Sequence, residues 1–153
     1  MPPTARDLLQ RRTEQRKVDE LRAAVAALRV GGVLSDDEVL SDWSRQELVA
    51  IGRTGSEPDV TLDENDAEPE RLADWLSELG RRADLGPRVY LGTSLEHLPW
   101  LDCEVASGGW IAQAWQNLGG SLRVVGGDRR RLLVVFEEEH AIEAFLRTDP
   151  AMA

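Results

Sequence analysis

The sequence predicts an α+β fold with a helical N-terminal part over about 4–53. A small, mostly antiparallel layer of ferredoxin-like type follows over about 58–147, with helices on one face of its sheet. Apolar residues recur at helical spacing in the first thirty positions, and two serine-led helix starts follow. After residue 58 the pattern reads strand, helix, strand, strand, helix, strand, strand, helix, which is the order that predicts the layer.

A chain of 153 residues has the length of one domain, and its 42% apolar content is enough for a core. We expect residues 1–54 to form a helical segment that packs on or extends the main domain. Residues 55–70 are expected to be an acidic linker or loop, and residues 58–150 the α+β domain.

The first predicted helix covers residues 4–29. Thr4 is a suitable N-cap, Gly31-Gly32 is a stop signal, and an apolar stripe runs between them through Val18, Leu21, Val25 and Leu28. Two good heptads are few for a coiled coil, so the pattern favours a helix packed on its own domain. The alternative is a homodimer formed through helix 4–29.

Two short helices are expected next. Ser35 and Glu38 have capping-box spacing, as do Ser44 and Glu47, which predicts helices over 36–43 and 45–53. Residues 60–62 then predict a short strand inside the acidic segment. That segment is no EF-hand loop, because Ala67 and Glu68 occupy the positions that need an oxygen ligand and a glycine.

The remaining elements are predicted from the spacing of apolar residues and from the positions of glycine and proline. Pro69 predicts a helix start, and the apolar face of this helix ends before Gly80 or Gly86. We expect strands at 88–91 and 100–105 with a helical turn at 94–98 between them, and then a helix at 110–118. A hairpin of strands 122–125 and 132–136 follows. A last helix over 138–147 would bury Ile142, Phe145 and Leu146.

Charge is sorted along the chain, whose net charge is −10. Residues 1–30 carry seven basic groups against four acidic ones, whereas residues 31–80 carry three against fourteen. A general nucleic-acid binder needs a basic face, so the balance argues against nucleic acid as a partner. No window is apolar enough to cross a bilayer or to act as a signal peptide, and the single cysteine allows no internal disulfide. We therefore expect a cytoplasmic protein without membrane contact.

The candidate chemistry is sparse. Cys103 alternates with Asp102 and Glu104 on its strand, which separates the thiol from its nearest carboxylates and favours a buried, inert cysteine. His97 and His140 are the only imidazoles, and no pair has the spacing of a zinc site. Glu137–His140 reads as a solvated charged edge. We predict no catalytic residue, no metal site and no cofactor.

These observations favour a soluble, acidic protein-binding module, such as an inhibitor or immunity-type protein that covers a basic partner. Trp110 lies off the core face of its predicted helix and is either an interface anchor or a side chain folded over the hairpin. The alternatives are a structural or regulatory subunit assembled through helix 4–29, and a small enzyme using Cys103. The candidate partner-binding residues are Asp36, Asp37, Glu57, Asp59, Asp63, Glu64, Asp66, Glu68 and Trp110.

Overall fold

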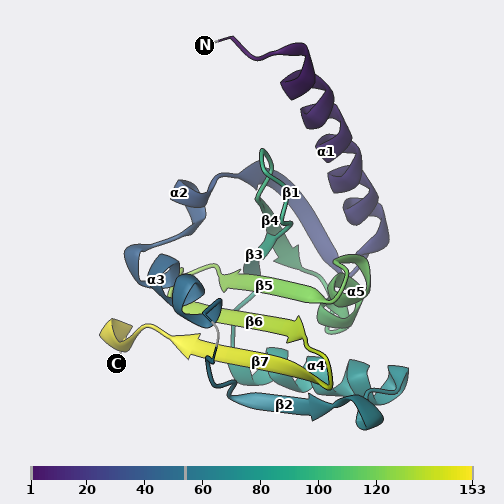
Figure 1. The fold of residues 1–153 in the computed structure, drawn as a ribbon, viewed down its shortest axis with the longest axis vertical. Helices are drawn as coiled ribbons and strands as arrows, with labels where there is room; N and C mark the ends of the chain where they lie inside the picture. Colours follow the sequence, from purple (N-terminus) through teal and green to yellow (C-terminus); the bar gives the residue numbers. More distant parts are fainter. Residues whose placement is uncertain (1, 54, 153) are drawn as a thin grey trace.

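The computed structural model describes residues 2–53 and 55–152 and shows a mixed α+β fold. In these ranges five α-helices accompany one seven-stranded sheet (Figure 1). The helices are α1 (Ala5–Ala24), α2 (Asp36–Val39), α3 (Asp42–Ile51), α4 (Pro69–Ala83) and α5 (Trp110–Asn117), with 3-10 turns η1 (Glu64–Asp66) and η2 (Pro150–Met152). The strands are β1 (Leu28–Leu34), β2 (Val60–Asp63), β3 (Arg88–Gly92), β4 (Trp100–Val105), β5 (Ser121–Gly126), β6 (Arg131–Glu137) and β7 (Ala141–Thr148).

The sheet has the strand order β1-β4-β3-β5-β6-β7-β2, and every neighbouring pair is antiparallel. This confirms the mostly antiparallel α+β class. The sheet is larger than the small layer expected, and the ferredoxin-like arrangement is not confirmed. The edge strands are β1 and β2, both from the N-terminal half of the chain.

Helices cover both faces of the sheet, not one. A large core lies between one face and α1, α4 and α5, through residues such as Val18, Leu76 and Trp115. A smaller core lies between the other face and α2 and α3, around Trp100 and Phe145. In Figure 1, α3 lies in front of the sheet and α4 behind it. The central strands are therefore apolar on both sides.

The expected helix 4–29 is too long. Thr4 is its N-cap as predicted, but the helix ends at Ala24, and Leu28–Leu34 form β1, which pairs with β4. Gly31 and Gly32 lie in the irregular part of that pairing, between Val30 and Val33. A Cβ on Gly31 would lie 3.2 Å from the carbonyl oxygen of Asp102, so glycine permits a close strand approach here. The helical region expected over 4–53 is thus interrupted by a strand.

Two short helices are present as expected, but α2 ends at Val39 instead of residue 43, and the cap of α3 is misplaced. Ser35 and Glu38 form the predicted capping box of α2. The cap of α3 is Ser41, with Ser44 as its partner, so this helix starts three residues earlier than expected. Pro69 begins α4 as predicted, and of the two expected stops the helix passes Gly80 and ends at Ala83, before Gly86.

The last helix, expected over 138–147, is wrong. Residues Ala141–Thr148 form β7, which pairs with β6 on one side and β2 on the other. Ile142 belongs to the larger core and Phe145 to the smaller one. Both faces of this strand are buried, so its apolar residues do not alternate and can be mistaken for a helical face.

No helix in the described ranges is long and apolar enough to cross a membrane.

Candidate functional site

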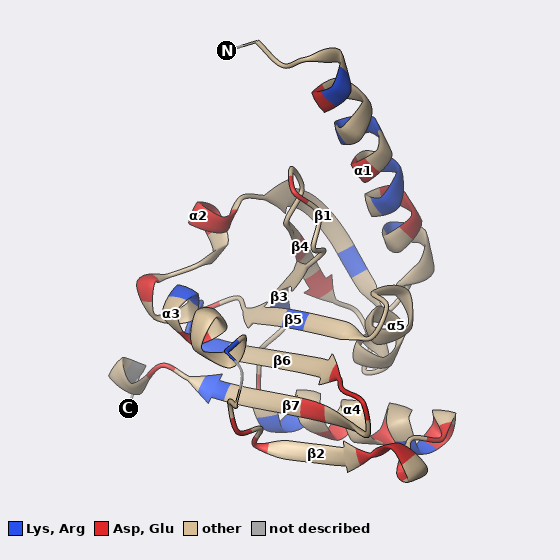
Figure 2. Cartoon of the chain, viewed as in Figure 1, with Lys and Arg blue, Asp and Glu red and all other residues tan. Residues whose placement is uncertain are grey.

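Two acidic runs that lie far apart in the sequence meet at one corner of the sheet. β2 pairs with β7 so that Asp63 is opposite Ala141, next to the turn that follows β6. The backbone N–H of Glu64 donates to the carbonyl oxygen of His140 at 3.0 Å. We call the resulting surface the acidic corner; its members are Asp63, Glu64, Asp66, Glu68, Glu137, Glu138 and Glu139. Figure 2 shows this red cluster where β6, β7 and the end of β2 converge.

All seven carboxylate residues of the acidic corner are exposed. The ion pairs formed with them by described residues are few and loose. Nδ1 of His140 lies 3.5 Å from Glu64, its Nε2 lies 3.6 Å from Glu139, and Arg71 lies 3.8 Å from Asp66. Exposed pairs of this kind contribute only ~0–1 kcal/mol each. The carboxylates of the corner are therefore little neutralised by the described residues, and together they give a negative potential at this surface.

An apolar groove adjoins the acidic corner. It has a volume of about 330 Å³ and runs between α4 and α5, with Leu72, Trp115 and Glu137 among its lining residues. Leu72 is half-buried and Trp115 is buried, so apolar surface lies within reach of the carboxylates.

Glu57 and Asp59 lie at the other end of β2. Asp59 Oδ2 accepts from the backbone N–H of Leu146 at 2.8 Å and forms an ion pair with Arg147. Arg147 also lies 3.5 Å from Glu47 of α3. Asp59 is thereby committed to tying β2 and α3 to β7, whereas Glu57 is exposed.

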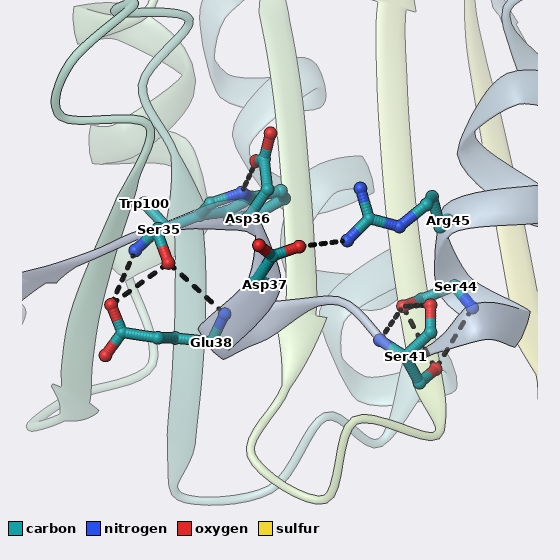
Figure 3. A network of polar contacts seen from close by, with 8 residues as sticks. All are labelled: Ser35, Asp36, Asp37, Glu38, Ser41, Ser44, Arg45 and Trp100. Carbon is teal, nitrogen blue, oxygen red and sulfur yellow. Dashed lines mark hydrogen bonds and ion pairs between the residues drawn. The ribbon is translucent and has the colours of Figure 1, made fainter.

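Asp36 and Asp37 lie apart from the acidic corner, on α2 (Figure 2). The indole N–H of Trp100 donates to Oδ1 of Asp36 at 2.7 Å, and Asp37 pairs with Arg45 of α3 at 3.0 Å. Figure 3 shows these contacts beside the two serine capping boxes. Trp100 is 1% exposed, so Asp36 satisfies a buried donor and has a structural role.

Trp110 is not a surface anchor. It is 7% exposed and belongs to the larger core, together with Ile111 and Trp115 of the same helix. Helix α5 packs against both α1 and α4, and Trp110 is covered in this packing. The residue is thus withdrawn from the expected partner-binding set.

The basic helix α1 does not neutralise the acidic third of the chain. In the described ranges, the acidic groups of residues 31–80 pair with arginines of that third, with Arg81, with Arg147 and with His140. Val18 and Leu21 of the apolar stripe are buried in the chain's own core. This stripe is therefore covered within the chain itself, as expected for a helix that packs on its own domain.

A buried carboxylate on α1 explains how the helix is placed. Glu14 accepts from the backbone N–H of His97 at 3.0 Å and contacts Nδ1 of His97 at 2.5 Å. Burial by itself would raise the pKa of Glu14, but the hydrogen bonds and the charge of His97 outweigh it and lower this pKa below its ordinary value. The pair joins α1 to the loop between β3 and β4.

Cys103 is buried, as the sequence indicates. Burial and the neighbouring charge of Asp102 raise the pKa of its thiol to about 12, so the thiol stays protonated at neutral pH. His97 is engaged by Glu14, and His140 lies at the acidic corner. The part of the chain that the structure describes shows no group of three His, Cys, Asp or Glu side chains arranged for a metal ion.

The structure thus brings together Asp63, Glu64, Asp66 and Glu68 from the predicted set and separates Asp36 and Asp37 from them. It adds Glu137–Glu139, which the sequence presents as a charged edge. Glu137–Glu139 lie beside β2 because the residues that follow them form a strand, β7, that pairs with β2. Comparisons with protein-family models, with curated proteins and with solved structures found no match.

Proposed function

We propose that this protein is an acidic protein-binding module that engages a basic partner at the acidic corner. The supporting observation is the convergence of two acidic runs, residues 63–68 and 137–139, beside an apolar groove. An inhibitor or immunity-type protein that covers a cationic surface is the functional class that fits this chemistry.

Complementary charge acts chiefly on the association rate. A cationic partner is attracted over a distance comparable with the Debye length, about 8 Å at physiological salt. Burial of an apolar side chain in the groove between α4 and α5 would then slow dissociation. The proposal therefore requires both steep salt dependence and an apolar contribution to binding.

The experiment compares two triple variants with the same net charge. Glu68, Glu138 and Glu139 are changed to Gln at the acidic corner, and Glu20, Glu96 and Glu104 are changed to Gln elsewhere as the control. All six residues are exposed, and each set raises the net charge of −10 by three. Partners are captured by cross-linking with the wild-type chain and identified, and one is purified for association kinetics.

We expect the corner variant to bind about tenfold more weakly, since three exposed pairs at roughly 0.5 kcal/mol each give that factor. Most of the loss should appear in the association rate and disappear in high salt, and the control should bind nearly as wild type. Equal binding by both triple variants would contradict the proposal.

A further inference from the structure

Arg123 is a half-buried cation that forms no ion pair with a carboxylate of the described residues. Three basic residues of the described chain are half-buried: Arg123 on β5, Arg131 on β6 and Arg147 on β7. Arg131 pairs with Asp84 at 3.3 Å, and Arg147 pairs with Glu47 and Asp59. The ion pairs of the described residues include none with Arg123. Because the chain has 28 acidic and only 18 basic groups, the lack of a carboxylate beside Arg123 needs an explanation.

The guanidinium of Arg123 is positioned by neighbours that do not neutralise it. It lies over the ring of Trp100, 5.6 Å from its centroid, and donates weakly to Oγ of Ser94 at 3.4 Å. A Cβ on Gly92 would lie 3.3 Å from Cβ and from Nε of Arg123, so glycine leaves room for the side chain to cross β3. A cation–π contact helps to hold a guanidinium in place and leaves its N–H groups available.

Two clefts meet at this side chain. One of about 530 Å³ lies between α1 and the loop after β3, and another of about 510 Å³ lies between α3 and the sheet. Both are lined by Ser94, Ser121 and Arg123. The junction therefore combines two hydroxyl groups with a cation.

The walls of the two clefts differ. The α3 cleft is lined by apolar side chains, including Leu48, Ile51 and Phe136. The α1 cleft has Lys17 and Glu20 on its rim, whose charges oppose each other. Arg123 is consequently the group that sets the charge preference at the junction, and the α3 cleft offers the apolar surface.

We propose that Arg123 anchors a binding site for a small organic anion, a carboxylate or phosphate joined to an apolar group. Its acidic head pairs with Arg123 beside Ser94 and Ser121, and its apolar part lies along Leu48, Ile51 and Phe136. An arginine fork matches the two oxygens of a carboxylate or phosphate, and such charge-assisted bonds are roughly twice as strong as neutral ones. The site is distinct from the acidic corner and goes beyond the proposed function.

The test uses four probes on the full chain: octanoate, octyl phosphate, octanol and inorganic phosphate. Binding is followed by two-dimensional NMR, through the indole N–H signal of Trp100 and the backbone signals of Ser94 and Ser121. At about 10 mM probe, a ligand with a Kd near 1 mM would be roughly 90% bound. We expect saturable shifts with octanoate or octyl phosphate and much weaker effects with octanol and inorganic phosphate, since each of these lacks one half of the ligand.

Variants separate a binding role from a structural one. Arg123→Gln should weaken binding of the anionic probe by about tenfold or more, which is the loss of one charge-assisted hydrogen bond. Arg130→Gln, at an exposed position of the β5–β6 turn, is the matched control and should bind as wild type. Ser94 has φ +62°, so Ser94→Gly removes the hydroxyl at a position where glycine is comfortable, and it should weaken binding without loss of stability.

The proposal is overturned if neither octanoate nor octyl phosphate gives saturable shifts at these residues. It is also overturned if Arg123→Gln stays folded by NMR and still binds the anion as wild type. If Arg123→Gln does not fold, Ser94→Gly is used in its place, and wild-type binding of the anion by Ser94→Gly then overturns the proposal. These measurements need no protein partner, so their failure and that of the proposed function are distinguishable.

Discussion

A hydrogen bond from the indole of Trp100 to Asp36 joins residues 64 positions apart. It ties the short helix α2 to β4, the strand next to the edge strand β1, and the capping box of Ser35 and Glu38 orients the same turn. Asp37, the next residue, makes an ion pair with its own side chain 93% exposed. Two adjacent aspartates of one helical turn thus differ in energetic role, since only Asp36 satisfies a buried donor.

Asp36→Ala should reduce the free energy of unfolding by about 1–3 kcal/mol, because the buried indole N–H loses its acceptor. Asp37→Ala is the matched control and should cost ~1 kcal/mol or less. Urea unfolding followed by tryptophan fluorescence measures both. Equal losses in the two variants would rule out a special role for Asp36.

The pairing of Glu14 with His97 predicts a pH dependence of stability. The pKa of Glu14 is lowered from the ordinary 4.5 in the folded state, so its contribution is present above that value. The contribution is lost as the pH falls through the lowered pKa, because the unfolded chain binds the proton more readily. Glu14→Gln should therefore flatten the decline in stability between about pH 5 and pH 3. Unfolding curves across that range test this slope, and parallel declines would contradict it.

At the scale of elements, local signals work where one face of an element is buried. Helix α4 follows its Pro69 start and its apolar face, with Leu76 and Leu79 each 1% exposed. Strands β1 and β7 were missed for two different reasons. β1 contains Gly31-Gly32, a pair that usually marks the end of a helix. β7 is buried on both faces, so its apolar residues do not alternate.

Phe145→Ala tests the position of β7 between the two cores. Phe145 is 2% exposed and its ring makes an edge contact with Phe136 at a centroid distance of 6.2 Å. Truncation should cost about 3–5 kcal/mol by the behaviour of buried phenylalanines. Leu146→Ala should cost less, because Leu146 is half-buried. A helix over 138–147 would make the two losses similar, and equilibrium unfolding distinguishes these outcomes.

At the scale of the whole molecule, the sheet brings two acidic runs together at one corner, away from the basic helix α1 (Figure 2). This separation follows from the pairing of β2 with β7, which closes one edge of the sheet. Like charges at a corner repel each other and lower the stability of the folded chain at low salt.

The triple change of Glu68, Glu138 and Glu139 to Gln should therefore raise the free energy of unfolding by about 0.5–1 kcal/mol at low salt. At 1 M salt, where the Debye length is about 3 Å, the gain should vanish. The triple change of Glu20, Glu96 and Glu104 is the control and should give a smaller gain. Guanidinium is itself a salt, so urea is the denaturant of choice. If the gain in free energy of unfolding persisted at 1 M salt, repulsion between the carboxylates would not be its cause, and the prediction would be wrong.

The sequence by itself determined the α+β class, the antiparallel hairpin of β5 and β6, the start of α4 and the burial of Cys103. Each of these four features depends on residues within about ten positions, through helix caps, turn residues and the spacing of apolar side chains. The tertiary structure alone decided that residues 28–34 and 141–148 are strands, because their partners lie far along the chain. It also decided which carboxylates share a surface, that Trp110 is covered, and that Arg123 has no counter-ion among the residues the structure describes. Such properties depend on long-range pairing and on what covers each face, which local patterns do not encode.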